Sequence, residues 1–350
     1  MAVAVTTHAS SIRVGSAAGI LADACRVTEP VVRESVALLP DPLRRMAGYH
    51  LGWWDQAGTA GAAGGAGSGK MQRAALTIAA AGACGGDTGV AVPAAAAVEL
   101  LHNFTLVQDD VMDADPLRRG RTTVWRVWGN TAAILLGDAL HALALQVLAT
   151  RLPPAVAVDA VARMESAAIE LAHAQHEDCA FETHDRVSVL EYLAMASGKT
   201  GALMGCACAL GALCVGAAED TISAMDRFGR ELGVAFQCAD DLLGIWGDPA
   251  VTGKPVGSDL VRRKWTLPVA AAVESGGGTA AELAELYRSP GPLTGSEVAR
   301  ARALIEAAGG RQLTRRWAEQ RSAAALQALP EHARTGDLAA LARIAVHRNR

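Results

Sequence analysis

Apolar residues recur at helical spacing along most of the chain, and few stretches show the alternation of a half-buried strand. Ala, Leu, Glu and Arg, which favour helix, dominate the periodic segments. The pattern therefore predicts an all-α protein. The predicted helices cover about residues 29–54, 70–83, 92–114, 129–150, 155–180, 188–198, 200–217, 219–246, 259–274, 279–288, 295–308, 311–328 and 336–347.

Glycine and proline clusters, such as Pro153–Pro154 and Gly309–Gly310, separate the predicted helices. A glycine-rich stretch over residues 58–69 predicts a flexible loop. None of these breaks is long enough to indicate a second domain, and no period of about 20–50 residues repeats. We expect an irregular segment over residues 1–28 and a single helical domain over residues 29–350.

Composition narrows the classes of function. The 350 residues carry 32 basic and 36 acidic side chains, a net charge of −4, which excludes the basic balance of a general nucleic-acid binder. The N-terminus lacks the basic start and apolar run of a signal peptide. The seven cysteines are odd in number and irregularly spaced, which indicates reduced thiols in a cytoplasmic protein.

One uncharged stretch, Thr200 to Ala218, approaches the length of a membrane span. It consists mainly of weakly hydrophobic Ala, Gly and Cys, and no aromatic belt flanks it. We therefore expect buried helices there and no membrane span.

A first acidic cluster ends the predicted helix 92–114. His102, Asp109 and Asp113 share one helix face, and Asp110 is adjacent. Two carboxylates about 4 Å apart repel by on the order of 4 kcal/mol at an effective dielectric of about 20, and a hard cation such as Mg²⁺ would offset this. A solvated acidic helix end remains the alternative for this cluster taken alone.

A second acidic pair, Asp240 and Asp241, lies on another apolar helix, where Gln237, Asp240 and Gly244 share a face. Two such helices facing each other across a bundle would build a magnesium site for a diphosphate. Arginine forks and lysine ammonium groups bind phosphate oxygens. Candidate cations are Arg118, Arg119, Arg121, Lys199, Lys254, Arg262, Arg263 and Lys264.

In this order, the motifs resemble those of the trans-prenyltransferases, the isoprenyl diphosphate synthases. Seven elements between about residues 69 and 268 match, and together they are far more specific than any one alone. They are Gly69-Lys70-x-x-Arg73, Glu99-x-x-His102, Asp109-Asp110-x-x-Asp113, Arg118-Arg119-Gly120, Lys199-Thr200, Phe236-Gln237-x-x-Asp240-Asp241, and Gly253-Lys254-Pro255 followed by Asp259 and Lys264-x-Thr266-Leu267-Pro268.

The resemblance implies an isoprenoid synthase helical bundle with a central cavity. It also implies a homodimer that condenses isopentenyl diphosphate with dimethylallyl, geranyl or farnesyl diphosphate. Three magnesium ions would be held by Asp109, Asp113 and Asp240. Substrate-binding roles divide among the basic and polar residues: Arg118, Lys199 and Lys264 for the allylic diphosphate, Lys70, Arg73, His102 and Arg119 for isopentenyl diphosphate, Thr200 and Gln237 for the allylic cation, and Lys254 as a further candidate.

By the same resemblance, the residues four and five positions before Asp109 set product length. Thr105 and Phe104 stand there. A single aromatic residue, Phe104, resembles enzymes that stop at twenty carbons, so we expect geranylgeranyl diphosphate.

The chain also departs from the family pattern. Met71 stands where Arg is frequent, and Ala74 stands where Pro is frequent. Gly244 replaces the last aspartate of the second motif, and Asp248 lies one turn further, where the helix is ending. Asp240 is the direct ligand by resemblance, so this change should not abolish metal binding.

Other functions fit less well. A class I terpene cyclase would share the fold but would not need Lys70, Arg73 and Arg119, and non-catalytic partner subunits usually lose the acidic pairs. Residues 64–70 fit a P-loop spacing, but Met71 replaces the Ser or Thr that would hold Mg²⁺ and no strand precedes it. A zinc site at His173, His176 and Cys179 would lack a fourth ligand, and nearby Gln175 and Asp178 receive only a supporting role.

Overall fold

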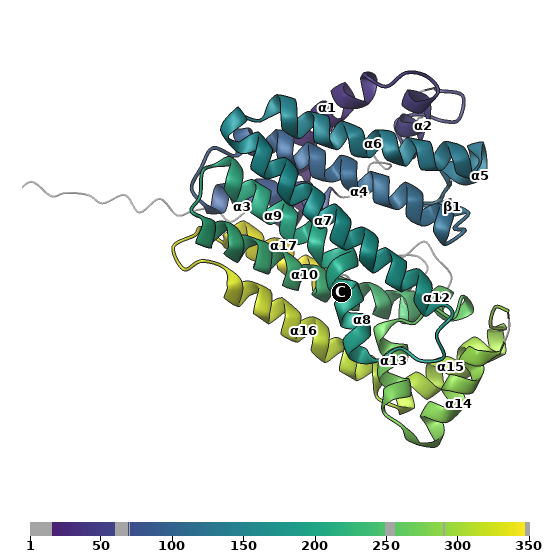
Figure 1. Cartoon of the computed structure of the whole chain (residues 1–350). Helices are drawn as coiled ribbons and strands as arrows, with labels where there is room; N and C mark the ends of the chain where they lie inside the picture. The colour runs from purple at the N-terminus through teal and green to yellow at the C-terminus, as the bar shows by residue number, and fades with distance from the viewer. Residues whose placement is uncertain (1–15, 60–68, 70, 249–255, 290, 347–350) are drawn as a thin grey trace, which may run out of the picture.

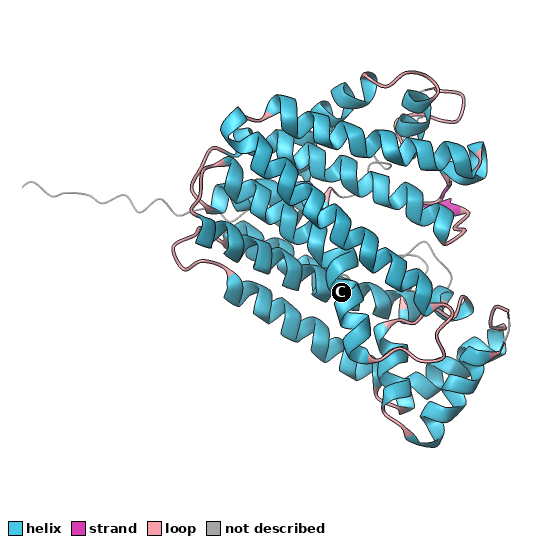
Figure 2. Ribbon diagram, viewed as in Figure 1, coloured by secondary structure: helices cyan, strands magenta, loops and turns pink. Residues whose placement is uncertain are grey.

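The uncharged segment after Thr200 forms the buried central helix of an α-helical bundle (Figure 1). In this computed structural model, which describes residues 16–59, 69, 71–248, 256–289 and 291–346, every residue of helix α9 (Ala202–Cys214) up to Ala212 is buried. Helix α9 packs against α3 (Gln72–Ala83), α7 (Pro154–Phe181) and α10 (Glu219–Trp246). The expectation of an all-α fold is confirmed (Figure 2).

The remaining helices surround this centre, and most agree with the predicted ranges within a few residues. They are α1 (Ala17–Ala37), α2 (Leu43–His50), α4 (Val92–Met112), α5 (Val124–Trp128), α6 (Asn130–Arg151), α8 (Val189–Ala196), α12 (Ser258–Val261), α13 (Leu267–Glu274), α14 (Gly277–Arg288), α15 (Gly295–Ala307), α16 (Gly310–Ala328) and α17 (Gly336–Val346), with short helical turns η1 (Thr88–Ala91) and η2 (Ser197–Gly201).

The expected N-terminal layout is wrong in two respects. Helix α1 begins at Ala17, so residues 17–28 are helical and not irregular, because Ser16 caps the helix by accepting a hydrogen bond from the Gly19 amide. The predicted helix 29–54 is divided into α1 and α2, because proline residues 40 and 42 interrupt it.

The predicted helix 259–274 is also divided, into α12 and α13. Pro268 lies in the first turn of α13, where its missing amide hydrogen costs nothing, and Arg263 adopts a left-handed backbone with φ of 54°. The break leaves Lys264 in a short loop between the two helices. This loop supplies one of the cations of the site described below.

Helix α4 is followed by a small hairpin that the sequence pattern did not indicate. Strands β1 (Leu117–Arg118) and β2 (Arg121–Thr122) pair antiparallel, with Leu117 opposite Thr122 and Arg118 opposite Arg121. The turn residues Arg119 and Gly120 both have positive φ, 53° and 73°, as a tight two-residue hairpin turn requires. The hairpin turns the arginines back toward the end of α4.

Helices α9 and α10 cross closely because glycines face each other. A Cβ atom added to Gly229 would lie 2.3 Å from the Met204 carbonyl oxygen, and one added to Gly233 would lie 2.5 Å from the Gly201 Cα. A π-helical turn, η2, joins α8 to α9 and carries Lys199 and Thr200.

Three helices in the described part of the chain are long and apolar enough to cross a membrane, judged by length and composition. They cover Thr88–Met112, Asn130–Arg151 and Val189–Cys214, and their most apolar windows are 61%, 44% and 78% buried within the protein. All seven cysteines are free thiols, with Cys206, Cys208 and Cys238 buried.

Candidate active site

Lys199 lies between carboxylates from two other helices. Its Nζ donates to Asp109 Oδ1 of α4 at 3.4 Å and to Asp178 Oδ2 of α7 at 2.5 Å. Burial opposes the charge on Lys199, yet the two carboxylates hold its pKa above the usual value. The structure therefore gives Asp178, predicted only as a supporting residue, a direct contact with the site.

The other acidic residue of the first motif, Asp113, pairs with a cation from a distant segment. Lys264, in the loop between α12 and α13, forms an ion pair with Asp113 Oδ2. The Asp113 side chain is only 8% exposed. Burial opposes the charge on Lys264, yet Asp113 holds the pKa of Lys264 above its usual value, so Lys264 is charged at neutral pH.

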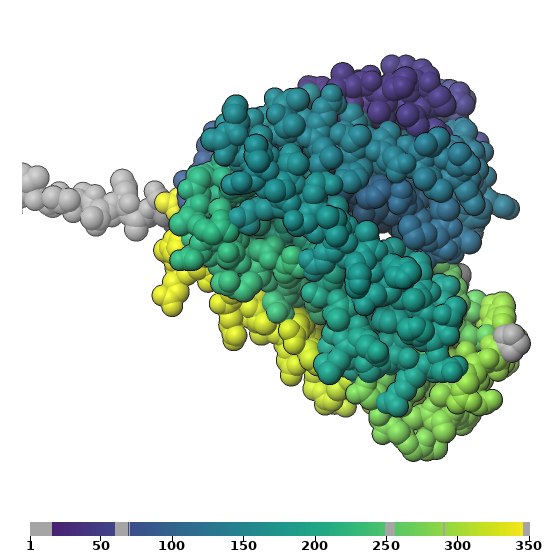
Figure 3. Space-filling view, viewed as in Figure 1, coloured from purple at the N-terminus to yellow at the C-terminus, as the bar shows by residue number. Residues whose placement is uncertain are grey.

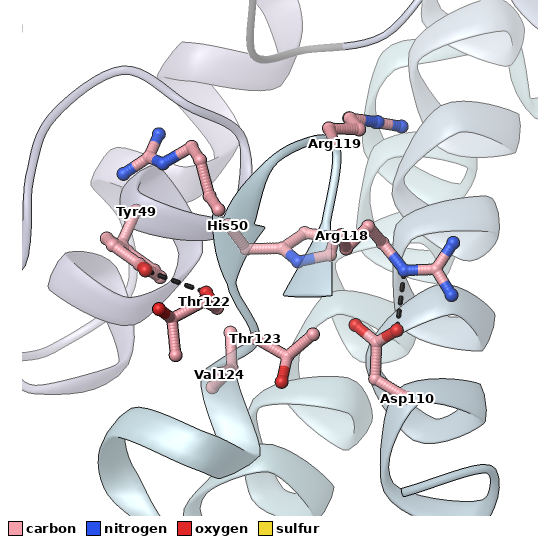
Figure 4. Close-up of a pocket in the computed structure, with 9 residues that line it drawn as sticks. Tyr49, His50, Asp110, Arg118, Arg119, Thr122, Thr123 and Val124 are labelled. Atoms are coloured by element: carbon pink, nitrogen blue, oxygen red, sulfur yellow. Dashed lines mark hydrogen bonds and ion pairs between the residues drawn. The ribbon is translucent and has the colours of Figure 1, made fainter. Parts of the chain in front are cut away.

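Arg118 of the hairpin holds the first two aspartates of the motif. Its Nε donates to Asp110 Oδ1 at 2.6 Å (Figure 4), and a terminal guanidinium nitrogen donates to Asp109 Oδ2 at 3.3 Å. Burial raises the pKa of Asp110 to about 6. Burial also disfavours the charge on Asp109, but Lys199 and Arg118 hold the pKa of Asp109 below its usual value. Asp110 therefore braces the hairpin, whereas Asp109 stays ionised.

The two aspartates of the second acidic pair lie in different environments. Asp240 is exposed on α10, whereas Asp241 is 2% exposed and accepts from Gln237 Nε2 and the Leu267 amide, both at 3.0 Å. Burial raises the pKa of Asp241 to about 7. The Thr200 hydroxyl donates to Gln237 Oε1 at 2.8 Å, so Asp241 fixes the amide orientation of Gln237 and, through it, Thr200.

A second basic group lies beside the hairpin. Arg73 of α3 donates to His102 Nε2 of α4 at 3.1 Å, and a Cβ added to Gly69 would lie 2.6 Å from the Arg119 guanidinium. Burial, and then the charges of Arg73 and Arg119, hold the pKa of His102 well below its usual value, so this imidazole is neutral. Three residues predicted to bind isopentenyl diphosphate, Arg73, His102 and Arg119, therefore lie together.

The predicted residues Lys70 and Lys254 lie outside the described residues. Met71 and Ala74, the two residues that depart from the family pattern in this region, pack together. The buried Met71 side chain lies in one cluster with Ala74 and Ala95. A long apolar side chain thus fills the space beside a small one.

His50 is a pocket residue that the sequence pattern did not indicate. It lines a small pocket with Tyr49, Asp110 and Arg119 (Figure 4), and its Nε2 lies 3.1 Å from Asn103 Oδ1. Burial, followed by the charges of Arg119 and Arg118, lowers its pKa to about 3. No motif marks His50, because its place depends on how α2 packs against the hairpin.

Helices α4 and α10, which carry the two acidic motifs, are linked across the site at their C-terminal ends. Lys264 pairs with Asp113 of α4, and the Lys264 amide donates at 2.9 Å to the Asp259 carbonyl oxygen in α12, which packs on α10. Figure 3 shows a hollow on this side, between the blue surface of the α4 region and the teal and green surface below it.

The donor set suits a hard cation. Asp109, Asp113 and Asp240 offer carboxylate oxygens, the ligands that Mg²⁺ prefers, with cations at hand for a phosphate group. Within the described residues no group of three or more His, Cys, Asp or Glu side chains is close enough to hold a metal by itself. This finding gives no support to the zinc alternative at His173, His176 and Cys179.

The two residues predicted to set product length lie on α4, one turn before the acidic motif. Phe104 stacks on His141 of α6, with ring centroids 5.0 Å apart. The Thr105 hydroxyl donates to the His102 carbonyl oxygen at 2.8 Å. Phe104 thus packs against α6.

The chain is similar in sequence and fold to known proteins. The family model described as polyprenyl synthetase matches residues 64–305. A geranylgeranyl diphosphate synthase of Mycobacterium tuberculosis is 55% identical over 321 residues, 91% of this chain and 90% of that protein. A (2E,6E)-farnesyl diphosphate synthase of Mycobacterium bovis is 44% identical over 302 residues, 85% of this chain and 82% of that protein.

A solved structure is also similar. The crystal structure of a polyprenyl synthetase from Streptomyces coelicolor A3(2) superimposes with a TM-score of 0.87 at 42% identity, covering 93% of this chain and 98% of that one.

Proposed function

The chain belongs to the polyprenyl synthetase family and is a trans-prenyltransferase, and we propose that it makes geranylgeranyl diphosphate by adding isopentenyl diphosphate to an allylic diphosphate. The observation that carries the proposal is the pairing of cations with the first acidic motif. Lys199 contacts Asp109, and Lys264 contacts Asp113. Cations and carboxylates set this close form a site that can exchange its internal ion pairs for a metal-bound diphosphate.

Magnesium is part of the proposal. Asp109, Asp113 and Asp240 would hold three ions, and bound Mg²⁺ neutralises a diphosphate and makes it a better leaving group. Lys199, Lys264 and Arg118 would then release their carboxylates and donate to the diphosphate oxygens.

The reaction joins two carbons and releases diphosphate. The carbon–oxygen bond of the allylic diphosphate breaks, and the electron pair of the isopentenyl double bond forms the new carbon–carbon bond. The Thr200 hydroxyl donates a hydrogen bond to Gln237 Oε1, so its oxygen lone pairs are available to face the allylic cation. The released diphosphate accepts the proton that leaves the isopentenyl carbon.

The second substrate would bind at Arg73, His102 and Arg119, with Lys70 as a further ligand. His102 is neutral and accepts from Arg73, so its other ring nitrogen carries the hydrogen. This arrangement presents donors to an anion without requiring a protonated histidine.

We further propose a cytoplasmic homodimer. Exposed apolar side chains follow α6 and α7, with Leu135 54%, Val158 75% and Ile169 71% exposed, and a second copy would cover them. The seven free thiols favour a reducing compartment.

The experiment is an incorporation assay with the purified protein, Mg²⁺ and radiolabelled isopentenyl diphosphate. Dimethylallyl, geranyl and farnesyl diphosphate are supplied in turn, and products are separated by chain length. We expect twenty-carbon product from each primer, loss of activity with excess chelator, and at least a hundredfold loss in Asp109→Asn. A hydrocarbon formed from primer alone would favour a terpene cyclase, and no reaction with any primer would favour a non-catalytic partner subunit.

A further inference from the structure

An ion pair joins helices α7 and α10 beside the turn η2, which carries Lys199 and Thr200. Arg230 Nη1 of α10 donates to Glu170 Oε1 of α7 at 2.7 Å. Arg230 Nε donates to Asp226 Oδ2, one turn earlier in α10, also at 2.7 Å. Two carboxylates therefore fix the guanidinium group, and one of them belongs to the neighbouring helix.

The turn η2 lies between these two helices at the level of the Glu170–Arg230 pair. A Cβ atom added to Gly198 would lie 2.7 Å from Ala174 Cβ and 3.3 Å from the Glu170 carbonyl oxygen. On the other side, a Cβ added to Gly201 would lie 3.0 Å from the Arg230 carbonyl oxygen. Because the glycines let both helices approach its backbone, the position of η2 depends on the spacing of α7 and α10.

The beginning of α9 is shaped to accept the Arg230 side chain. A Cβ added to Gly205 would lie 2.7 Å from Arg230 Cγ and 2.7 Å from Asp226 Oδ1. Any larger residue at this position would push aside the side chain that reaches Glu170. The segment that follows η2 therefore also contacts this ion pair.

The ion pair lies on the helix faces that contact the two site residues. Asp178, which accepts from Lys199, lies about two turns after Glu170 on one face of α7. Gln237, which accepts from Thr200, lies about two turns after the arginine on one face of α10. A change in the spacing of α7 and α10 at the ion pair would therefore shift the partners of both site residues.

We propose that Arg230, through its ion pair with Glu170, is a positioning residue that holds η2 so that Lys199 and Thr200 face the allylic diphosphate. The inference rests on the proposed function, since both residues belong to that site. Isopentenyl diphosphate would bind at residues of α3, α4 and the hairpin, so loss of the ion pair should affect the two substrates differently. A displacement of about 1 Å can reduce a rate about a hundredfold, so a small shift of η2 is sufficient.

A second ion pair joins the same two helices and provides a matched control. Arg163 of α7 donates to both carboxylate oxygens of Glu219, at the start of α10, at 2.7 Å. The Arg163 side chain is 31% exposed, close to the 32% of Arg230. Glu219 lies about three turns before Arg230 along α10. Exposed ion pairs contribute little to stability, so the two pairs should differ in their effect on the site and not in their effect on the fold.

The test removes each ion pair and measures the two substrates separately. The variants are Arg230→Met, Glu170→Gln, the combination of these two, and Arg163→Met as the control. Steady-state incorporation assays with the full-length protein and Mg²⁺ give kcat, the KM of farnesyl diphosphate and the KM of isopentenyl diphosphate. Circular dichroism melting checks that each variant is folded, and Glu170→Gln tests the same contact if Arg230→Met does not fold.

We expect Arg230→Met and Glu170→Gln each to lower kcat about tenfold and to raise the KM of farnesyl diphosphate, with the KM of isopentenyl diphosphate changed less than about twofold. The double variant should lose about as much as the larger single loss, because both changes remove one interaction. Arg163→Met should keep the wild-type constants.

Three results would overturn the inference: wild-type kcat in both single variants, an equal loss in Arg163→Met, or equal rises in the two KM values. Losses that add in the double variant would also contradict it, because the two residues would then act separately. If the wild-type protein incorporates no isopentenyl diphosphate, the proposed function itself is wrong.

Discussion

The ring of Phe104 stacks on the imidazole of His141, with centroids 5.0 Å apart and planes inclined by 19°. His141 Nε2 lies 2.8 Å from Glu165 Oε1, so α7 holds the imidazole that supports the ring. A Cβ added to Gly137 would lie 3.2 Å from the Phe104 ring, which places the phenyl group closely against α6. Contacts from α6, and through His141 from α7, therefore hold this aromatic side chain.

Replacing Phe104 by alanine should lengthen the product. Removal of the ring opens space below the first acidic motif, so elongation should continue past twenty carbons, with products of twenty-five carbons or more. Product lengths are read by chromatography of labelled products after dephosphorylation. Phe104→Tyr, which keeps the ring, should retain the twenty-carbon product, and an unchanged distribution in Phe104→Ala would place the chain-length limit elsewhere.

Acid should destabilise the protein through His50. The pKa of His50 is about 3 in the fold, against an ordinary value of 6.5, so the unfolded chain binds the extra proton between these values. The free energy of unfolding therefore falls as the pH drops below 6.5, by about 1.4 kcal/mol per pH unit for this one group. His50→Gln keeps a donor toward Asn103 and should remove this contribution to the pH dependence of the free energy of unfolding.

Urea unfolding at several pH values between about 7 and 5 measures this effect. The matched control is His173→Gln, because the His173 side chain is 73% exposed. If the free energy of unfolding depends on pH equally in His50→Gln and His173→Gln, then His50 does not cause the loss of stability in acid.

The helices that carry the acidic motifs could be predicted from sequence. Helix α10 spans Glu219–Trp246 as predicted, because its apolar period is regular and Gly247 ends it. The spacing of Asp109 and Asp113 likewise places both on one face of α4 whatever the surrounding fold. These features depend only on contacts within one helix.

The partners of these carboxylates could not be predicted in the same way. Lys264 is 151 residues from Asp113, and its position depends on the break between α12 and α13. Asp259 appeared in the sequence only as a match to a pattern, and nothing in that pattern placed its carboxylate against Gly244, where an added Cβ would lie 1.8 Å from Asp259 Oδ2. An apolar period shows which face of a helix is buried, but not which distant side chain meets its polar face.

A methyl group at the crossing of α9 and α10 should destabilise the fold. A Cβ on Gly229 would approach the Met204 carbonyl oxygen to 2.3 Å and the Gly205 Cα to 2.7 Å, and backbone atoms in a packed crossing cannot move aside freely. Gly229→Ala should therefore lower the free energy of unfolding by about 1–3 kcal/mol or more. Gly278→Ala is the control, because a Cβ there meets nothing within 4 Å and alanine favours the helix by about 0.5–1 kcal/mol. Urea midpoints that fall equally in both variants would contradict the close crossing.

A charge on the exposed face of α6 should separate the proposed homodimer. Leu135 is 54% exposed on α6, and burying an arginine there against a second copy would leave a charge without a partner. Leu135→Arg should raise the dimer dissociation constant at least a hundredfold, as measured by light scattering during size-exclusion chromatography. Leu190→Arg is the matched control, since Leu190 is 74% exposed on α8, away from α6, and this variant should remain a dimer. If the wild-type protein is monomeric at micromolar concentration, or if Leu190→Arg dissociates as readily, the exposed face of α6 is not the interface.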